Sequence, residues 1–178
     1  MDTPRQIVSK WRKRFALARL PGLEEQPRGG RPALFSPPLQ RDALAIERLV
    51  LGTEHPDTLN GMFSLGTILR REGRYPESEK IYRETLPIQI RVLGPEHSDT
   101  LNSRNSLAVD LAAQGRYHEA EGLYRENRAI QLRVFGLENA YSALSTYNLA
   151  CLAAVQGYRN RALALLKEAW GTGHYAQH

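Results

Sequence analysis

The chain has 178 residues, 42% of them hydrophobic and 24% charged, which suits one soluble domain of ordinary size. Its single cysteine excludes an internal disulfide and fits a reducing compartment, the cytoplasm. No run of about 18 apolar residues is present that could span a membrane. The net charge of +5 comes from the first 50 residues, with 10 basic against 5 acidic side chains, whereas residues 51–178 carry 14 of each. The high pI therefore does not indicate a nucleic-acid-binding surface.

The first expected element is a basic amphipathic helix over residues 6–20. Ile7, Trp11 and Phe15 fall on one face, and lysine and arginine occupy much of the rest. Such a helix is suited to docking on the folded part of the chain, to hanging as a loose tail, or to binding an acidic membrane surface or partner. It does not resemble a secretory signal, because Arg19 interrupts the apolar part and no small-residue cleavage site follows. Residues 21–38 are rich in Pro and Gly, so residues 1–39 are predicted to be poorly ordered.

The dominant feature of the chain is an internal repeat. Residues 51–92 align without gaps on residues 93–134, an offset of 93 − 51 = 42, with 23 identities in 42 positions. A third, looser copy runs from residue 135 to about residue 170. A fixed period of this kind predicts an array of stacked units over residues 40–170, with units at 51–92, 93–134 and 135–170 and a tail at 171–178.

A partial unit precedes the first full copy. The sequence QRDALAIERLVLG at 40–52 matches YRETLPIQIRVLG at 82–94 in register. Residues 40–50 are therefore predicted to form the second half of a second helix. The alternative is a helix that simply caps the array.

Each unit is predicted to contain two helices. The first begins after His55, with Pro56 suited to a first helical position, because its missing N–H needs no partner there. Leu65 and Leu69 are four residues apart and predict a buried face. Gly73 then ends the helix, since glycine tolerates the left-handed conformation. The same positions recur in the later copies as Leu107, Leu111 and Gly115, and as Leu149, Ala153 and Gly157.

The second helix follows at once, with Pro76 in its first turn. Its buried stripe in the first unit is predicted to be Ser78, Ile81, Tyr82 and Thr85. Pro87 lies well inside this helix and predicts a kink or an early end in the first unit alone, because the second unit has alanine at that place.

These residues resemble the tetratricopeptide repeat in its long-period form, the kinesin-light-chain-like type. The residues that carry the resemblance are Leu65, Gly66, Gly73, Tyr75, Ser78 and Tyr82; Leu107, Ala108, Gly115, Tyr117, Ala120 and Tyr124; and Leu149, Ala150, Gly157, Ala162 and Leu166. The resemblance implies an all-α fold, a right-handed superhelix of about three helix-turn-helix repeats. It also implies a protein-interaction function rather than catalysis.

In this family the first helices of the units line the concave face, and that face binds peptides or helices. Carried over by position, the predicted groove residues are Asn60, Phe63, Ser64, Thr67, Arg70 and Arg71; Asn102, Asn105, Ser106, Val109, Ala112 and Ala113; and Leu144, Tyr147, Asn148, Cys151 and Ala154. Amides suit an extended peptide backbone, and aromatic rings suit an anchor side chain. Alternatively, the asparagines cap or bridge helices within the array.

We find no phosphate loop, kinase motif, nucleophile elbow or metal-ligand spacing, so we expect no enzymatic activity, cofactor or metal. The leading hypothesis is a scaffold that binds a protein or peptide partner and acts as a monomer or weak homo-oligomer. No nucleic acid is expected as a partner. The alternative is a regulatory or truncated fragment of a larger signalling kinase or NTPase, self-associating through residues 162–170, which lack a polar cap.

Overall fold

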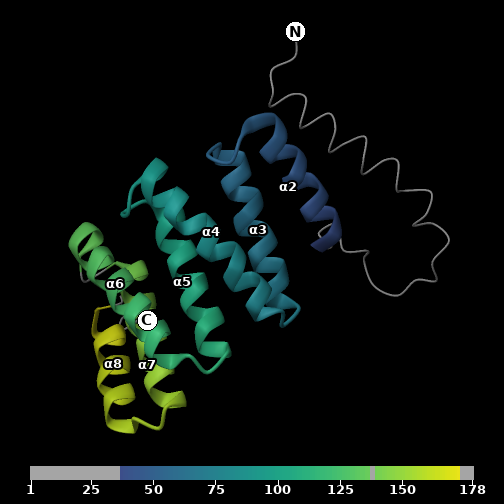
Figure 1. The fold of residues 1–178 in the computed structure, drawn as a ribbon. Helices are drawn as coiled ribbons and strands as arrows, with labels where there is room; N and C mark the ends of the chain where they lie inside the picture. Colours follow the sequence, from purple (N-terminus) through teal and green to yellow (C-terminus); the bar gives the residue numbers. More distant parts are fainter. Residues whose placement is uncertain (1–36, 137–138, 173–178) are drawn as a thin grey trace, which may run out of the picture.

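The computed structural model describes residues 37–136 and 139–172, and within these ranges the chain forms seven α-helices and no strand (Figure 1). The helices are α2 (Pro37–Leu51), α3 (Pro56–Arg71), α4 (Tyr75–Leu93), α5 (Ser98–Ala113), α6 (Tyr117–Phe135), α7 (Ala140–Val155) and α8 (Arg159–Thr172). The first helices of the units are α3, α5 and α7, and the second helices are α4, α6 and α8. The predicted all-α repeat fold is confirmed.

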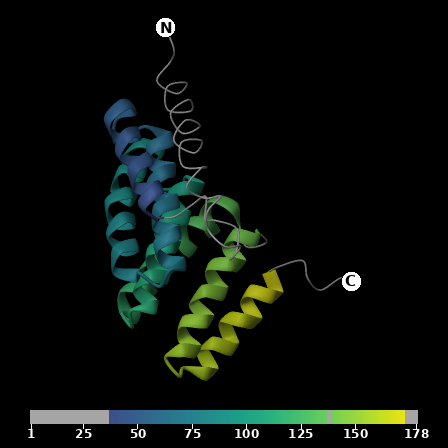
Figure 2. The same ribbon diagram turned by 90° about the vertical axis from the view of Figure 1, so that its right-hand side faces the viewer.

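Each helix packs against its neighbours in sequence, as in a solenoid of antiparallel helix pairs. The pair α7 and α8 is turned relative to the preceding helices, as Figure 2 shows from the side. A small rotation at each repeat produces the superhelical twist.

The leucine that marks each unit occupies an equivalent buried place. Leu65, Leu107 and Leu149 are 2%, 3% and 5% exposed. Their partners one turn later, Leu69, Leu111 and Ala153, are also buried. The predicted stripe of the second helix is correct as well, since Ser78, Tyr82 and Thr85 are buried and Ile81 is partly buried. The repeating sequence thus produces a repeating core.

The first helix of each unit begins with a side-chain cap. His55 Nδ1 accepts a hydrogen bond from the Asp57 backbone N–H at 3.2 Å, and His97 does the same for Asp99. In the third unit Asn139 Oδ1 accepts from the Tyr141 N–H at 2.9 Å. A capping acceptor satisfies one of the N–H groups left free at a helix start. In the third unit, asparagine therefore caps the first helix in place of the histidine of the other two units.

Glycine ends the first helices as predicted. Gly73, Gly115 and Gly157 have φ of +75°, +77° and +82°, a conformation that side chains with a Cβ rarely adopt. The helices α2, α4 and α6 also end at glycines with positive φ, namely Gly52, Gly94 and Gly136. The helix α2 thus ends like a second helix, in register with residues 82–94.

Three expectations need correction. The sequence predicted a kink or an early end at Pro87. The helix α4 continues through Pro87 to Leu93, so the early end is wrong, and α6, with alanine at that place, has the same length of 19 residues. The helix α2 begins at Pro37, three residues before the predicted start at residue 40, because prolines are tolerated in a first turn where N–H groups need no partner. The tail predicted at 171–178 begins two residues later, because α8 continues to Thr172. The predicted helix over residues 6–20 and residues 173–178 lie outside the described residues.

Candidate peptide-binding groove

The first and second helices are spaced differently along the array. The helix α3 contacts α5 directly. The second helices are instead joined through long side chains: Arg41 of α2 binds Glu77 of α4 at 2.7 Å, and Arg83 of α4 binds Glu119 of α6 at 3.3 Å. Closer first helices and wider-spaced second helices are what an array curved around its first helices requires. The side of α3, α5 and α7 is therefore the candidate groove.

The predicted groove residues differ in exposure. Exposed are Asn60, Arg71, Asn102, Ala113, Leu144, Tyr147, Cys151 and Ala154. Partly buried are Phe63, Ser64, Thr67, Arg70, Asn105, Val109, Ala112 and Asn148. Ser106 is buried at 4% exposure and offers no surface to a partner, because it faces the second helices rather than the groove.

The α3 part of this face is held rigid by Tyr82 of α4. Thr67 Oγ1 bonds the Phe63 carbonyl at 3.0 Å and lies 3.0 Å from the Tyr82 hydroxyl. The Phe63 ring meets the Tyr82 ring edge-on, with centroids 5.7 Å apart. Thr67 and Phe63 are thus fixed by packing and hydrogen bonds, and they present a preorganised edge rather than a mobile one.

Two of the predicted asparagines bond each other. Asn148 Nδ2 of α7 donates to Asn105 Oδ1 of α5 at 2.8 Å, so this pair bridges the second and third units. The bridging role that the sequence left open therefore applies to Asn105 and Asn148. Asn60 and Asn102 remain exposed on α3 and α5.

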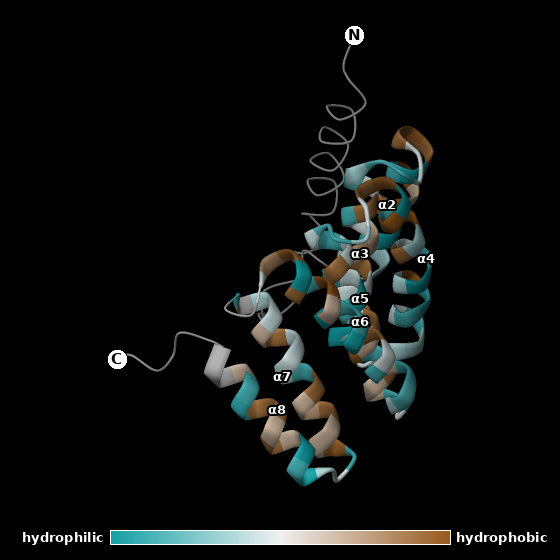
Figure 3. Ribbon diagram, turned by 90° about the vertical axis from the view of Figure 1, so that its left-hand side faces the viewer, coloured by the Kyte–Doolittle hydropathy of each residue, from teal (hydrophilic) through white to brown (hydrophobic). Residues whose placement is uncertain are grey.

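An apolar stripe runs along α7 and consists of Tyr141, Leu144, Tyr147 and Cys151. The steps of three, three and four residues place all four on one helix face. Tyr141, Leu144 and Tyr147 are 52%, 50% and 47% exposed, and Cys151 is exposed too. Figure 3 shows hydrophobic residues recurring along α7. We call these four residues the α7 stripe.

The sequence analysis missed Tyr141. The corresponding residues in the other units are Asp57 and Asp99, so alignment to them pointed to a charged first turn. The available signal was its spacing of three residues before Leu144. Its ring also contacts Phe135 at the end of α6, with centroids 5.8 Å apart. The contact extends the apolar surface of α7 onto the preceding unit.

The α3 end of the candidate groove, at the other end of the array from the α7 stripe, is basic. Arg70 and Arg71 lie in the last turn of α3, and Arg71 is exposed. Burial raises the pKa of the nearby Asp110 to about 6, while Ser78 and then Arg70 act in the opposite direction. The Arg70 guanidinium therefore interacts with the buried Asp110 carboxyl group within the array. Of the two arginines, Arg71 is the more exposed to solvent.

No group of three or more potential ligand side chains suited to a metal ion occurs within residues 37–136 and 139–172. Over the same residues, no helix combines the length and apolar character needed to cross a bilayer.

The sequence profile of the tetratricopeptide repeat matches residues 38–88 and 61–126, which together cover half of the chain. The chain belongs to the tetratricopeptide repeat family. Its structural neighbours are of the kinesin-light-chain-like kind, as the resemblance implied. No curated protein matches.

One solved neighbour is BtubC (BKLC) from P. vanneervenii, with 24% identity and a TM-score of 0.69 over 79% of this chain. The match spans 55% of the BtubC chain. Two structures of a Podosopora anserina kinesin light chain-like protein with nearly identical TPR-like repeats align at 20% identity. Their TM-scores are 0.70 and 0.68, and each alignment covers 97% of this chain and 96% or 97% of the other. At these identities the similarity establishes the fold.

Proposed function

We propose that this protein is a non-enzymatic scaffold that binds a peptide or short helix along α3, α5 and α7. The α7 stripe is the observation that carries the proposal. A monomeric fold exposes single apolar residues without consequence, but four on one helix face form a surface suited to a partner. Tyrosine is also among the residues that dominate binding energy at interfaces.

A cytoplasmic location is proposed for this protein because its single cysteine fits a reducing compartment.

Different residues of this face would make different kinds of contact with the partner. Leu144 and Tyr147 are placed to contact apolar anchors of the partner. The exposed amides of Asn60 and Asn102 supply hydrogen bonds to its backbone. The rigid pair of Phe63 and Thr67 lowers the entropy lost on binding, because these side chains are already ordered.

The test uses peptides selected from a random display library on the full chain. A Leu144→Ser/Tyr147→Ser variant removes the centre of the α7 stripe, and we expect these peptides to bind at least about tenfold more weakly. The matched control is Leu49→Ser on α2, which removes a side chain that is 86% exposed elsewhere. Peptides that bind both variants as tightly as the original chain would remove the basis for the proposal.

The amide contribution is tested separately. Asn102→Ala alters an exposed side chain without touching the Asn105 to Asn148 bridge. We expect weaker peptide binding and an unchanged melting temperature. Asn105→Ala should instead lower the melting temperature, because it removes a hydrogen bond between units.

Self-association is the second candidate. Leu163 of α8 is 48% exposed, whereas the matching positions Glu79 and Glu121 are acidic. An apolar side chain on the last described helix favours pairing of α8 between two copies, which would fit a regulatory fragment of a larger signalling protein. Light scattering tests it: a mass that stays monomeric at high concentration argues against this candidate.

A further inference from the structure

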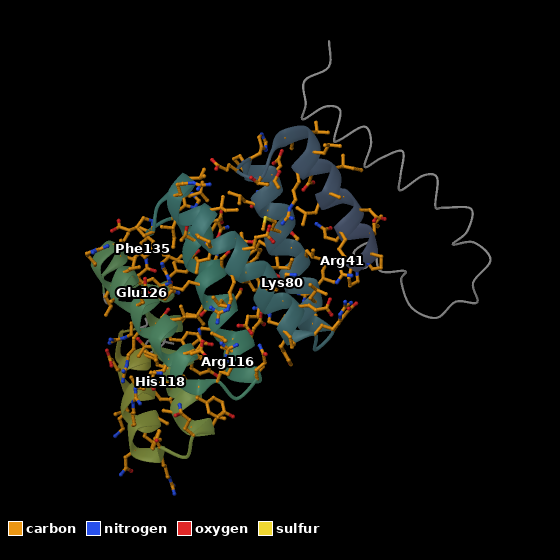
Figure 4. The ribbon with its side chains drawn as sticks, viewed as in Figure 1. Arg41, Lys80, Arg116, His118, Glu126 and Phe135 are labelled. Carbon is orange, nitrogen blue, oxygen red and sulfur yellow. The ribbon has the colours of Figure 1, made fainter. Side chains whose placement is uncertain are left out.

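The boundary between α6 and α8 holds an open cleft of about 740 Å³ with a cationic lining. Its wall comes from the first three turns of α6, the first turn of α8 and the turn after α7. The lining residues are His118, Glu121, Arg125, Gln156, Gly157, Tyr158, Arg159, Asn160 and Arg161. With His118 neutral, three arginines face one carboxylate, a local charge of +3 − 1 = +2. Figure 4 marks His118 where α6 meets α8.

The matching place between α4 and α6 is electrically balanced. Shifting the lining by 42 residues gives Arg83 and Arg116 as cations and Glu79 and Glu119 as anions. There Glu119 receives two bonds from Arg116, each 2.6 Å long, and one from Arg83. In the third unit its position is occupied by Arg161. The excess charge is therefore specific to the α6–α8 cleft and not a general feature of the array.

The carboxylate that remains does not neutralise the cleft. Glu121 accepts from Arg161 and from Arg125 and is shared between them. The pKa of Glu121 is lowered, with the Arg161 bond as the main cause, so it carries its negative charge at neutral pH. The nearby Glu119 is already bound to Arg116 and Arg83. Guanidinium groups keep donors beyond those used for Glu121, because each has five N–H groups.

We infer that the α6–α8 cleft binds an anionic side chain of a partner polypeptide. Planar guanidinium groups bind carboxylate and phosphoryl groups through paired hydrogen bonds. Tyr158 and Asn160 add a hydroxyl and an amide to the same wall. A polypeptide fits better than a long nucleic acid, because Glu119 lies in the same part of α6 as His118 and Glu121 and residues 51–178 have no net charge. This site lies beyond the end of α7 and is separate from the α7 stripe.

The experiment uses labelled peptides of defined charge and the full chain. The probes are a hexaglutamate, a peptide with three phosphoserines, and their glutamine and serine counterparts, measured by fluorescence anisotropy at low salt. We expect the anionic peptides to bind, with affinity that falls as salt screens the charges. The stronger of the two anionic probes identifies carboxylate or phosphoryl as the preferred group.

Arg161→Glu is the decisive variant, because it restores the residue type found at the same place in the other two units. Because the variant loses the ion pair between Arg161 and Glu121, we expect a slightly lower melting temperature, an unchanged circular dichroism spectrum, and binding that is at least about tenfold weaker. Arg159→Tyr, which also copies the other units, should weaken binding to a smaller degree. The control is Arg71→Glu, which changes the net charge by the same amount at the end of α3.

Four results would overturn the inference. They are no binding of either anionic peptide at about millimolar concentration, equal binding by Arg161→Glu, a larger loss for Arg71→Glu than for Arg161→Glu, or tighter binding of a single-stranded oligonucleotide than of both peptides. The Leu144→Ser/Tyr147→Ser variant should keep this binding. The cleft and the α7 stripe can therefore fail independently.

Discussion

Ser78 Oγ of α4 lies 2.6 Å from Asp110 Oδ2 of α5 and 2.8 Å from the Gly66 carbonyl oxygen. Both side chains are fully buried between the first and second units. The next junction has Ala120 and Leu152 at the matching places, both buried and apolar. A serine hydroxyl has one proton, so both contacts become hydrogen bonds at once when Asp110 is protonated and donates to Ser78. The first junction thus contains a polar pair that the fold does not require.

Removing only the serine should be costly. Ser78→Ala leaves the buried Asp110 without its hydroxyl partner, and we expect a loss of about 1–3 kcal/mol in the free energy of unfolding. The double variant Ser78→Ala/Asp110→Leu copies the next junction. The double variant should have a free energy of unfolding equal to or greater than that of the original chain, because well-packed apolar residues often replace buried polar groups without penalty. Urea unfolding checks both, and a double variant weaker than the single one would contradict this account.

Asp110 should also make stability depend on pH in an unusual direction. Burial raises its pKa from 3.8 to about 6 in the folded chain, so the folded state favours the protonated form. Stability from this group is therefore greatest at low pH and falls as pH rises from about 4 to 6, by up to about 3 kcal/mol.

Asp110→Asn lacks this titration and provides the comparison. The difference in unfolding free energy between the variant and the original chain should grow in favour of the variant from pH 4 to pH 6 and stay constant above. Other carboxylates titrate in both proteins and cancel in the difference. A difference that is independent of pH would show that Asp110 titrates normally.

Gly66 is predicted to tolerate no side chain. A Cβ built there would lie 2.7 Å from Tyr82 Cζ, and the Tyr82 hydroxyl is held by Thr67. We expect Gly66→Ala to lower the free energy of unfolding by about 1–3 kcal/mol through overpacking. Gly122→Ala is the matched control, because nothing lies within 4 Å of a Cβ at that helical position. It should instead raise stability by about 0.5–1 kcal/mol. Thermal melts followed by circular dichroism distinguish the two.

Pro87→Ala should stabilise α4. The proline is part of a continuous helix of 19 residues and has no N–H to donate to the preceding turn. The second unit has Ala129 in the same place and an uninterrupted α6. We expect a gain of about 1–3 kcal/mol in the free energy of unfolding, measured by urea titration, without a change in helical content. A loss of stability would mean that Pro87 has a favourable packing role in α4.

The sequence could predict whatever the three units share. Leu65 and Gly73 recur at a fixed spacing in all three units, and each has one physical role, so the helix ends and the core followed from them. The early end predicted at Pro87 was wrong. The helix continues because the packing of α4 against α3 and α5 outweighs the loss of one backbone hydrogen bond.

What the units do not share was harder to predict. Asp110 looks like an ordinary surface residue in the sequence, and only its burial against Ser78 reveals its role. Arg161 likewise becomes informative only when its neighbours across the α6–α8 cleft are known. The bond between Asn105 and Asn148 depends on side-chain directions between units, which a single helix pattern does not specify.

The ion pairs between second helices have a consequence for how such a chain can grow. Arg41 meets Glu77, and Arg83 meets Glu119, so each arginine finds its acid 36 residues later, in the following unit. A tandem duplication of one 42-residue unit therefore adds one glutamate and one arginine. The new glutamate can pair with the arginine of the preceding unit, and the new arginine can pair with the glutamate of the following unit. Lengthening by whole copies of the first two units keeps these arginine–glutamate pairs matched, whereas an insertion that is not a multiple of 42 residues would separate an arginine from its glutamate.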